Sequence, residues 1–410
     1  MRRGLAVAML GIALLATACQ TGSSAPPAAR QTPAGEPSLW VAIDLPGTYS
    51  GDRAAAYDPS RNCLWIATHI WAEFAGDTEH ATLTRLNLAD HSVVQTGLRL
   101  PATGWEGAWV LVDDHDRVWM AWGRTVFSYD PASATLAKFG FPGFAQLGLH
   151  PSFYSGDGNL ITLGRDSTGE LWAAFSRVAA IIGFNPSLGK WDRVIKLPWF
   201  PSGVSSSRPG VLVISGGRTP DDKQFFFKLA ELDLASQSIR EYDAGPGTYT
   251  VADPHTMVFV DASGNLGRLD LDTGDVTILD GPSLINTIGS PFGIRGDGYA
   301  WYSIGTGVAR VDIATGVMTR YQFPAVVPTS PVPNICLDHS GFGPCVLPCP
   351  SGVTSCVPKP WIPAAQIYAL TFDAHGNIWV VTDQAGTQRP SSLGREPLPT
   401  GPVMELRVGS

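Results

Sequence analysis

The sequence has few charged residues, few cysteines and, beyond its first residues, no long apolar run. Charged residues make up 16% of the 410 residues, and lysines and arginines form no extended run. With a formal net charge of -8, this distribution argues against nucleic acid as a partner and against electrostatic docking on anionic lipid. Gly-x-Ser-x-Gly, P-loop and dinucleotide-binding motifs are also missing, so nothing supports hydrolase, nucleotide or redox chemistry of those types.

No long stretch shows the apolar period of an amphipathic helix. Instead, 45 glycines and 33 prolines separate short runs of apolar residues. Glycine and proline supply the backbone angles of tight turns and interrupt helices, so the composition predicts many short strands joined by turns. The sequence therefore favours an all-β fold, and its length suits one repeat array.

The first residues have the layout of an export signal. Arg2 and Arg3 precede an apolar run from Leu5 to Leu15, which is too short for the ~20 residues of a transmembrane helix. Residues 16–19 read ATAC and resemble the bacterial lipobox, in which the cysteine is lipidated. We therefore expect residues 1–19 to be a lipoprotein signal peptide with its acyl chains on Cys19, ordinary signal-peptidase cleavage nearby being the alternative.

Residues 20–37, rich in Ser, Pro, Ala and Gly, are expected to form a disordered tether. The protein would then lie outside the cytoplasm, anchored by lipid to the bacterial membrane, at the cell surface or in the periplasm.

Residues 291–324, PFGIRGDGYAWYSIGTGVARVDIATGVMTRYQFP, have the pattern of one four-stranded antiparallel blade of a β-propeller. Short strands alternate with an Asp-Gly turn and an Ala-Thr-Gly turn. Four strands cannot bury both faces of their sheet alone, so the pattern has to recur. Seven second strands align, centred on Trp65, Trp119, Trp172, Leu212, Val258, Trp301 and Trp379. The tryptophans are expected to fill the space between neighbouring blades.

Two further patterns complete the repeat. An Asn or Asp follows the third strand of six blades, where its side chain can hold the next turn: Asn87, Asp130, Asn185, Asp233, Asp270 and Asp312. The seventh blade lacks an outer strand, but residues 39–46 match the outer-strand pattern and can pair beside residues 404–408. The sequence thus predicts a seven-bladed propeller over residues 38–410, closed by its N-terminal strand.

The connections between the strands are unequal in length. Tight turns join first to second and third to fourth strands, whereas long segments join second to third strands or one blade to the next. Both longer types emerge on the same face of a four-stranded meander, so function is expected there. The ligand-binding candidates of that face are His69, Trp71, Glu73, Trp105, Glu106, His150, Tyr154 and Asp157, together with His80, Asp221 and Asp222. His115, His255 and His375 are expected on the opposite face.

Four of the six cysteines lie in an insertion at residues 325–365, namely Cys336, Cys345, Cys349 and Cys356. In an exported segment with little apolar content they predict two disulfides, with three pairings open. Their spacing lacks the paired Cys-x-x-Cys of common zinc sites. Cys63 lies beside Leu64 and Trp65 in a predicted strand and is expected to be a buried free thiol.

The blade at residues 291–324 resembles the repeats of the virginiamycin B lyase family and of NHL-type propellers. The resemblance rests on its Pro-x-Gly-Ile opening, Asp-Gly turn, Trp strand and Asp-x-x-Thr-Gly turn. It implies the architecture of a metal-dependent lyase family that uses a histidine base with a glutamate two residues before it. No Glu-x-His occurs here, because Glu79 and His80 are adjacent, so no catalytic residue is carried over.

Two functions from different classes are compatible with the sequence. A face rich in insertions favours a binding or scaffold module for a small molecule, a glycan or a protein, attached to the membrane by its lipid and monomeric. The alternative is a metal-dependent lyase or lactonase with a divalent metal in the central channel, as in gluconolactonase-like propellers. The sequence names no metal ligand and no certain cofactor.

Overall fold

The computed structural model describes residues 40–43, 45, 53–70, 80–101, 109–122, 124–149, 160–175, 178–217, 228–243, 247–261, 264–279, 292–304, 307–323, 367–382 and 403–408. They all belong to one compact unit, Ser38–Ser410. The predicted signal peptide, its Cys19 and the predicted tether lie outside the described residues, so these stay predictions.

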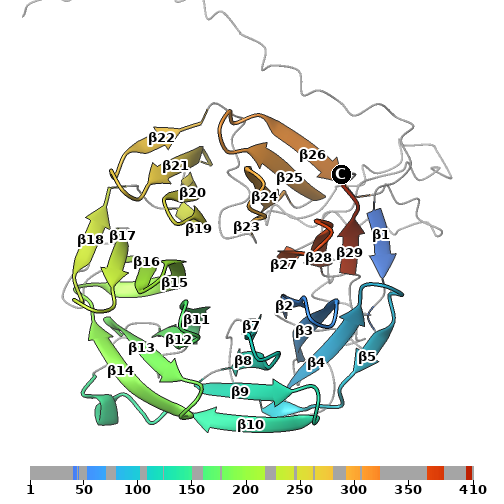
Figure 1. The fold of residues 1–410 in the computed structure, drawn as a ribbon, viewed down its shortest axis with the longest axis horizontal. Helices are drawn as coiled ribbons and strands as arrows, with labels where there is room; N and C mark the ends of the chain where they lie inside the picture. Colours follow the sequence, from blue (N-terminus) through green and yellow to red (C-terminus); the bar gives the residue numbers. More distant parts are fainter. Residues whose placement is uncertain are drawn as a thin grey trace, which may run out of the picture. The chain divides into compact units, whose positions relative to one another are not determined.

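Seven antiparallel sheets form the blades of a ring (Figure 1). Blade 1 holds β2 (Arg53–Asp58), β3 (Cys63–Ile70), β4 (His80–Asn87) and β5 (Val93–Gln95), and the short β6 (Leu100–Pro101) also pairs with β4. Blade 2 holds β7 (Trp109–Val112), β8 (Val118–Trp122), β9 (Thr125–Asp130) and β10 (Thr135–Gly140). Blade 3 holds β11 (Leu160–Arg165), β12 (Leu171–Phe175), β13 (Ala180–Asn185) and β14 (Lys190–Lys196).

The remaining blades repeat this order, from the inner to the outer strand. Blade 4 holds β15 (Phe200–Arg208), β16 (Val211–Gly217), β17 (Lys228–Asp233) and β18 (Ile239–Tyr242). Blade 5 holds β19 (Gly247–Asp253), β20 (Thr256–Asp261), β21 (Leu266–Asp270) and β22 (Val276–Ile278). Blade 6 holds β23 (Phe292–Ile294), β24 (Tyr299–Ser303), β25 (Gly307–Asp312) and β26 (Met318–Gln322). Blade 7 holds β27 (Ile367–Phe372), β28 (Ile378–Thr382), β29 (Val403–Leu406) and β1 (Trp40–Ile43).

The N-terminal strand closes the ring as predicted. Strand β1 pairs antiparallel with β29, so that Trp40 lies opposite Leu406 and Ile43 opposite Val403. A strand from one end of the domain therefore completes the sheet begun at the other end, and both sheet edges that would otherwise be exposed are paired. The fold is an all-β seven-bladed propeller, with one short 3-10 turn, η1 (Ala145–Leu147), among the described residues.

The core lies between neighbouring blades. Trp65, Trp119, Trp172, Trp301 and Trp379 are at most 2% exposed, and each packs in a cluster with residues of the following blade. This confirms that they are packing residues. Each such cluster buries one face of two sheets at once, which a single blade cannot do.

The alignment of blade 4 on Leu212 is wrong by one residue. Val213, not Leu212, lies opposite the third-strand residue Glu231 and packs with blade 5, as Trp301 lies opposite Arg310 and packs with blade 7. Leu212 faces blade 3 instead. A shift of one residue moves a strand side chain to the opposite face of its sheet, and the run VLVIS is apolar on both faces, so its pattern does not fix the register.

The six predicted turn-holding residues all accept hydrogen bonds from backbone N–H groups two or three residues further on. Asp130, for example, accepts from Ala132 N at 2.9 Å, and Asp312 accepts from Ala314 N at 2.9 Å and Thr315 N at 2.8 Å. Asn87, Asn185, Asp233 and Asp270 make the equivalent bonds. The prediction is confirmed, and these side chains are structural.

Candidate functional site

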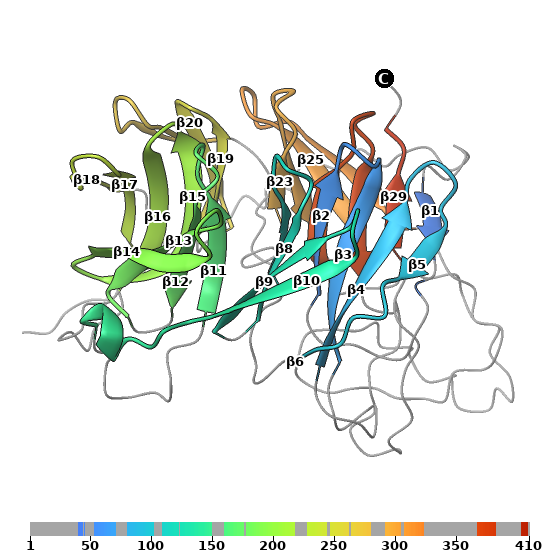
Figure 2. The same ribbon diagram turned by 60° about the horizontal axis from the view of Figure 1, so that its bottom comes forward.

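The strand order divides the propeller into two unlike faces. The first face, called the turn face here, carries the connections between first and second and between third and fourth strands; it lies at the top of Figure 2. The second, called the insertion face, carries the connections between second and third strands and those between blades. Between β1 and β29, every stretch outside the described residues joins strand ends on the insertion face.

Most of the predicted ligand-binding residues belong to those stretches. The candidates outside the described residues are Trp71, Glu73, Trp105, Glu106, His150, Tyr154, Asp157, Asp221 and Asp222. The predicted disulfide cysteines, Cys336, Cys345, Cys349 and Cys356, also lie outside them. The structure therefore does not test whether these residues lie close together, and their roles stay predictions.

His69 is a predicted candidate that the structure does place. It lies near the end of β3 on the insertion-face side, with an exposed fraction of 0%. Its ring meets Trp122 of β8 edge-on, with 5.9 Å between the ring centroids. His69 is therefore part of the packing between blades 1 and 2 and does not project from the surface.

His80 lies next to this packing, at the start of β4. It pairs across the sheet with Ile70, and its Nδ1 is 3.3 Å from Arg99 Nη2. The exposed fraction of His80 is 9%. Blade 1 therefore presents two largely buried imidazoles beneath the insertion face, and they are the described residues that underlie the predicted site.

On the turn face, a repeated Asp–Trp pair fixes the junction between first and second strands. The indole Nε1 of the second-strand tryptophan donates to an aspartate that ends the first strand or follows it directly. These bonds join Trp65 to Asp58 at 3.0 Å, Trp119 to Asp113 at 2.8 Å, Trp172 to Asp166 at 2.9 Å and Trp379 to Asp373 at 3.0 Å. The separation of Asp and Trp is six residues in three of these blades and seven in blade 1.

The carboxylates of these pairs also hold the tight turns. Asp113 Oδ1, for example, accepts from the backbone N–H groups of His115 and Arg117, each at 2.9 Å. Burial alone would raise the pKa of Asp113, but its hydrogen bonds from Trp119 and Arg117 outweigh burial, and the net effect lowers the pKa. The pKa of Asp58 is lowered in the same way, by Trp65 and other donors against the effect of burial. These acids are engaged inside the blades, which favours structural roles.

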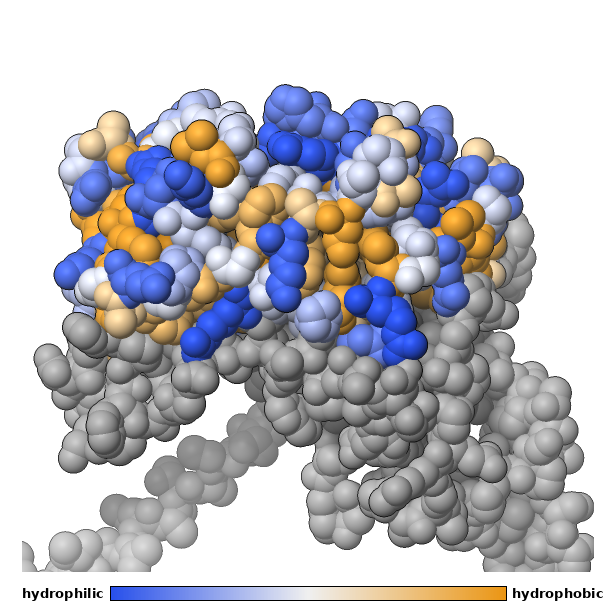
Figure 3. Space-filling view, turned by 90° about the horizontal axis from the view of Figure 1, so that it is seen from below, coloured by the Kyte–Doolittle hydropathy of each residue, from blue (hydrophilic) through white to orange (hydrophobic). Residues whose placement is uncertain are grey.

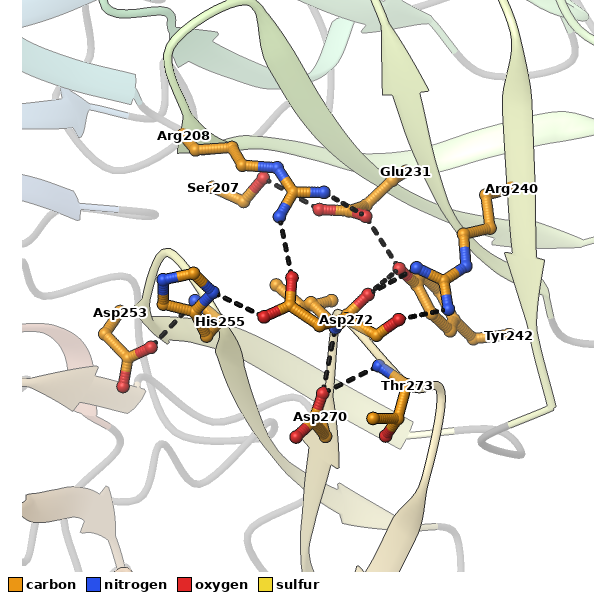
Figure 4. A network of polar contacts seen from close by, with 11 residues as sticks. Ser207, Arg208, Glu231, Arg240, Tyr242, Asp253, His255, Asp270, Asp272 and Thr273 are labelled. Atoms are coloured by element: carbon orange, nitrogen blue, oxygen red, sulfur yellow. Dashed lines mark hydrogen bonds and ion pairs between the residues drawn. The ribbon is translucent and has the colours of Figure 1, made fainter.

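Blade 4 replaces the Asp–Trp pair with a polar network that reaches blade 5 (Figure 4). Arg208 takes the place of the aspartate, and Val213 that of the tryptophan. Arg208 Nη2 lies 3.1 Å from Glu231 Oε2 within the blade, and Arg208 Nη1 lies 3.1 Å from Asp272 Oδ1 in the turn between β21 and β22. This arginine therefore joins the two blades.

Glu231 is the centre of the network, with an exposed fraction of 4%. It accepts hydrogen bonds from Ser207 Oγ at 3.2 Å and from the Tyr242 hydroxyl at 2.6 Å. Burial first, and then the hydrogen bond to Glu231, raise the pKa of Tyr242, so its hydroxyl keeps its proton. Arg240, whose guanidinium lies over the Tyr242 ring at 5.1 Å, donates to two carbonyl groups of blade 5.

His255 lies at the exposed end of the network, in the turn between β19 and β20. Its Nδ1 is 2.6 Å from Asp272 Oδ2, and the two side chains are 66% and 52% exposed. Like His115 and His375, it lies in a first-to-second-strand turn on the turn face, as predicted. The pair is continuous with Arg208, so we interpret it as the end of an inter-blade staple rather than as an acid–base pair.

The outer edge of the propeller carries scattered apolar side chains. Figure 3 shows hydrophobic and hydrophilic residues interspersed along the described part of one edge. The exposed large apolar residues belong to several blades: Val94, Leu136, Leu188, Val276, Ile278 and Val317. Single apolar residues of this kind are normal on protein surfaces.

Three further observations concern predicted chemistry. Cys63 is a buried free thiol, as predicted, and burial raises its pKa to about 12. No group of three or more His, Cys, Asp or Glu that could hold a metal ion occurs in the described part of the chain, and a metal in the central channel stays a prediction. In the same part of the chain, no helix is long and apolar enough to cross a membrane.

Comparison with known proteins shows similarity in structure but not in sequence. No family model and no curated protein matches the sequence. Among solved structures, a streptogramin B lyase aligns with a TM-score of 0.57 and 11% identity, covering 90% of this chain and 97% of that one. A catalytically inactive virginiamycin B lyase from Staphylococcus aureus with quinupristin aligns with a TM-score of 0.57 and 12% identity, covering 90% of this chain and 99% of that one.

Propellers of other kinds align almost as well. The WD40 domain of Pan2 from Neurospora crassa has a TM-score of 0.53 and 10% identity, with 88% of this chain and 90% of that chain covered. Because identity is this low in every case, the likeness shows the fold and leaves the site open. In architecture, the chain is a seven-bladed β-propeller like virginiamycin B lyase.

Proposed function

We propose that the protein is an exported, lipid-anchored β-propeller that binds its target through the insertion face. The observation that carries the proposal is the difference between the turn face and the insertion face. On the turn face, the described carboxylates hold turns, tryptophans and neighbouring blades. The long connections contain nearly all the predicted ligand-binding residues, and they join strand ends on the insertion face. In proteins generally, binding residues are often carried by loops that a rigid scaffold positions.

The lipid anchor rests on the sequence around Cys19. Two or more acyl chains give stable attachment, at ~0.8 kcal/mol for each buried CH₂ group. Replacement of the cysteine in Cys19→Ala should move the protein from the membrane fraction to the soluble fraction or block its processing. Labelled palmitate should enter the wild type and not the variant; membrane association of the variant at the wild-type level would contradict the anchor.

Binding is tested by altering one face at a time. Replacement of residues 326–360 by a Gly/Ser linker should weaken binding of the purified protein to isolated cell-envelope material, glycans or envelope proteins. The matched change on the turn face, His255→Ala, removes a 66% exposed side chain and should leave binding unchanged. If binding were lost in His255→Ala alone, the target would bind the turn face, and this would contradict the proposal.

A metal-dependent lyase or lactonase is the second candidate, favoured by the shared architecture with virginiamycin B lyases. Elemental analysis of the purified protein should then find a stoichiometric divalent metal. Ring opening of quinupristin or of a simpler lactone, followed by chromatography, should stop on chelation and recover with the metal. A metal-free protein that still binds its target would favour the binding module.

A further inference from the structure

The polarity of β1 fixes the face on which the chain enters the propeller. Strand β29 is a third strand, so it begins on the insertion face at Val403 and ends on the turn face at Leu406. Strand β1 runs antiparallel to β29, with Trp40 opposite Leu406 and Ile43 opposite Val403. The chain therefore enters β1 at the turn face, on the outer strand of blade 7.

The entry point is held by packing against two blades. Trp40 is 8% exposed, and the centroid of its ring lies 4.9 Å from that of Phe323, the residue after β26. Both rings belong to the cluster between blades 6 and 7 that also contains Trp301 and Leu406. Because a buried indole contributes a large apolar area to a core, the start of β1 is a fixed attachment point for the chain that precedes it.

The depth of the propeller separates this point from the insertion face. Strand β3 runs through that depth with eight residues, which span about 25 Å. The predicted tether, residues 20–37, is rich in Ser, Pro, Ala and Gly, and a flexible chain of this length has a root-mean-square span of roughly 23 Å. Fully extended it reaches about 60 Å, so only its stretched conformations pass the outer edge of the propeller.

We propose that the anchored propeller keeps its turn face towards the membrane that carries its lipid and presents its insertion face to the aqueous space. The inference rests on the lipid anchor and on the insertion-face binding proposed above. In the opposite orientation the tether has to run along the outer edge of blade 7 to beyond the insertion face, which costs conformational entropy. The target is accordingly a molecule that approaches from the aqueous side, and not a lipid headgroup of the anchoring membrane.

Charge favours the reverse orientation, so its effect can be separated from that of the tether. The turn face carries exposed carboxylates, with Asp114 79%, Asp116 46% and Asp272 52% exposed, and an anionic membrane repels them. At physiological ionic strength this repulsion is screened beyond about 8 Å, a distance shorter than the span of the tether. We therefore expect the same orientation on neutral and on anionic vesicles.

Two lysines at opposite ends of β14 provide a matched pair of probe sites. Lys190 lies at the turn-face end and Lys196 at the insertion-face end, and both are exposed; the strand places them about 20 Å apart. Lys190→Cys and Lys196→Cys are made in the full acylated chain, labelled with a donor dye and bound to vesicles that contain acceptor-labelled lipid. Energy transfer should be at least about twofold greater from Lys190→Cys. The wild type, in which Cys63 is 1% exposed, measures background labelling.

A second pair in blade 6 tests for attachment by the outer edge of the propeller. Thr319, towards the turn-face end of β26, and Gln322, at its insertion-face end, are both exposed. Thr319→Cys should again give more transfer than Gln322→Cys. Equal transfer within each pair, with more from blade 6 than from blade 3, would show that the edge beside blade 7 faces the membrane and would overturn the proposal.

The length of the tether gives the sharpest test. Insertion of about 30 Gly/Ser residues after Pro37 raises the root-mean-square span to roughly 38 Å, so the ratio of transfer within each pair should fall towards one. An unchanged ratio would mean that the tether does not set the orientation, and greater transfer from Lys196→Cys on neutral vesicles would reverse it; either result overturns the proposal. A protein that does not float with vesicles contradicts the lipid anchor and this orientation together, whereas a floating protein with equal transfer contradicts the orientation alone.

Discussion

Blades 1, 2, 3 and 7 differ from blades 4 and 6 at the end of the first strand. In the first group an aspartate accepts a hydrogen bond from the tryptophan of its own blade. In blades 4 and 6 the same position is an arginine that reaches the next blade: Arg208 contacts Asp272, and Arg295 donates to the carbonyl of Gly376 at 2.8 Å. At this position an aspartate bonds the tryptophan of its own blade, whereas an arginine reaches the following blade; Arg208 also contacts Glu231 within its own blade.

Blade 5 has neither arrangement. Asp253 is exposed and accepts from His255 N at 2.8 Å, and the second-strand position holds Val258, which has no donor to offer. The aspartate alone is therefore a turn residue. An aspartate at this position takes part in the core only where a buried tryptophan indole donates a hydrogen bond to it.

The largest effect should come from a change that spares every one of these junctions. Deletion of residues 39–45 removes β1 and exposes the edge of β29, so we expect aggregation or a large fall in melting temperature. Size-exclusion chromatography and thermal unfolding measure the outcome. Deletion of residues 20–37 is the matched control and should leave both unchanged; a monomeric β1 deletion with wild-type melting would refute closure by this strand.

The next largest effect should separate an Asp–Trp junction from the junction of blade 5. Asp113→Ala leaves the buried indole N–H of Trp119 and the Arg117 guanidinium without their acceptor, so we expect a loss of about 2 to 3 kcal/mol in the free energy of unfolding. Asp253→Ala removes an exposed turn bond and should cost less than about 0.5 kcal/mol. Denaturant unfolding of both variants measures the difference, and equal losses would show that the indole bond contributes nothing.

Acid should weaken the same junctions selectively. The folded protein lowers the pKa of Asp58 and Asp113, so both groups stabilise it above the unfolded pKa of about 4, and this stability is lost as the pH falls through the folded pKa. The free energy of unfolding should therefore decline below about pH 4. In Asp113→Ala the decline should be shallower than in the wild type, because one of the carboxylates that takes up a proton is absent.

A small effect should also come from the exposed end of the blade 4–5 network. Asp272 is 52% exposed, so Asp272→Ala should cost about 0 to 1 kcal/mol, and less at high salt. Glu231→Ala, at 4% exposure, should cost more, about 1 to 3 kcal/mol, because Tyr242 and Arg208 lose a buried acceptor. A larger loss for Asp272→Ala than for Glu231→Ala would contradict the assignment of Glu231 as the centre.

The repeat and its closure could be predicted because they rest on local patterns. The turn residues follow the third strands directly, and the outer-strand pattern of β1 is visible without a partner. The Asp–Trp pair also had a signal in the spacing of Asp113 and Trp119, since a turn of this length brings the two together across a hairpin.

The rest depends on contacts between repeats. Arg208 and Asp272 are 64 residues apart. An arginine recurs at the same position in blade 6, but its partner there is the carbonyl of Gly376, so no repeated pattern indicates the pair. The register of blade 4 failed for a related reason: its short turn and bulge shift Val213 into the position expected for Leu212.

The pairing of β1 with β29 also sets the order in which the chain can finish folding. Strand β1 leaves the ribosome before any blade, and β29 leaves after six blades are complete in sequence. Until then β1 has no strand to pair with, and blade 7 has no outer edge. Closure of the ring therefore waits for the last strand of the domain and joins its earliest and latest parts, and a chain halted before β29 emerges keeps two open edges for as long as it is held.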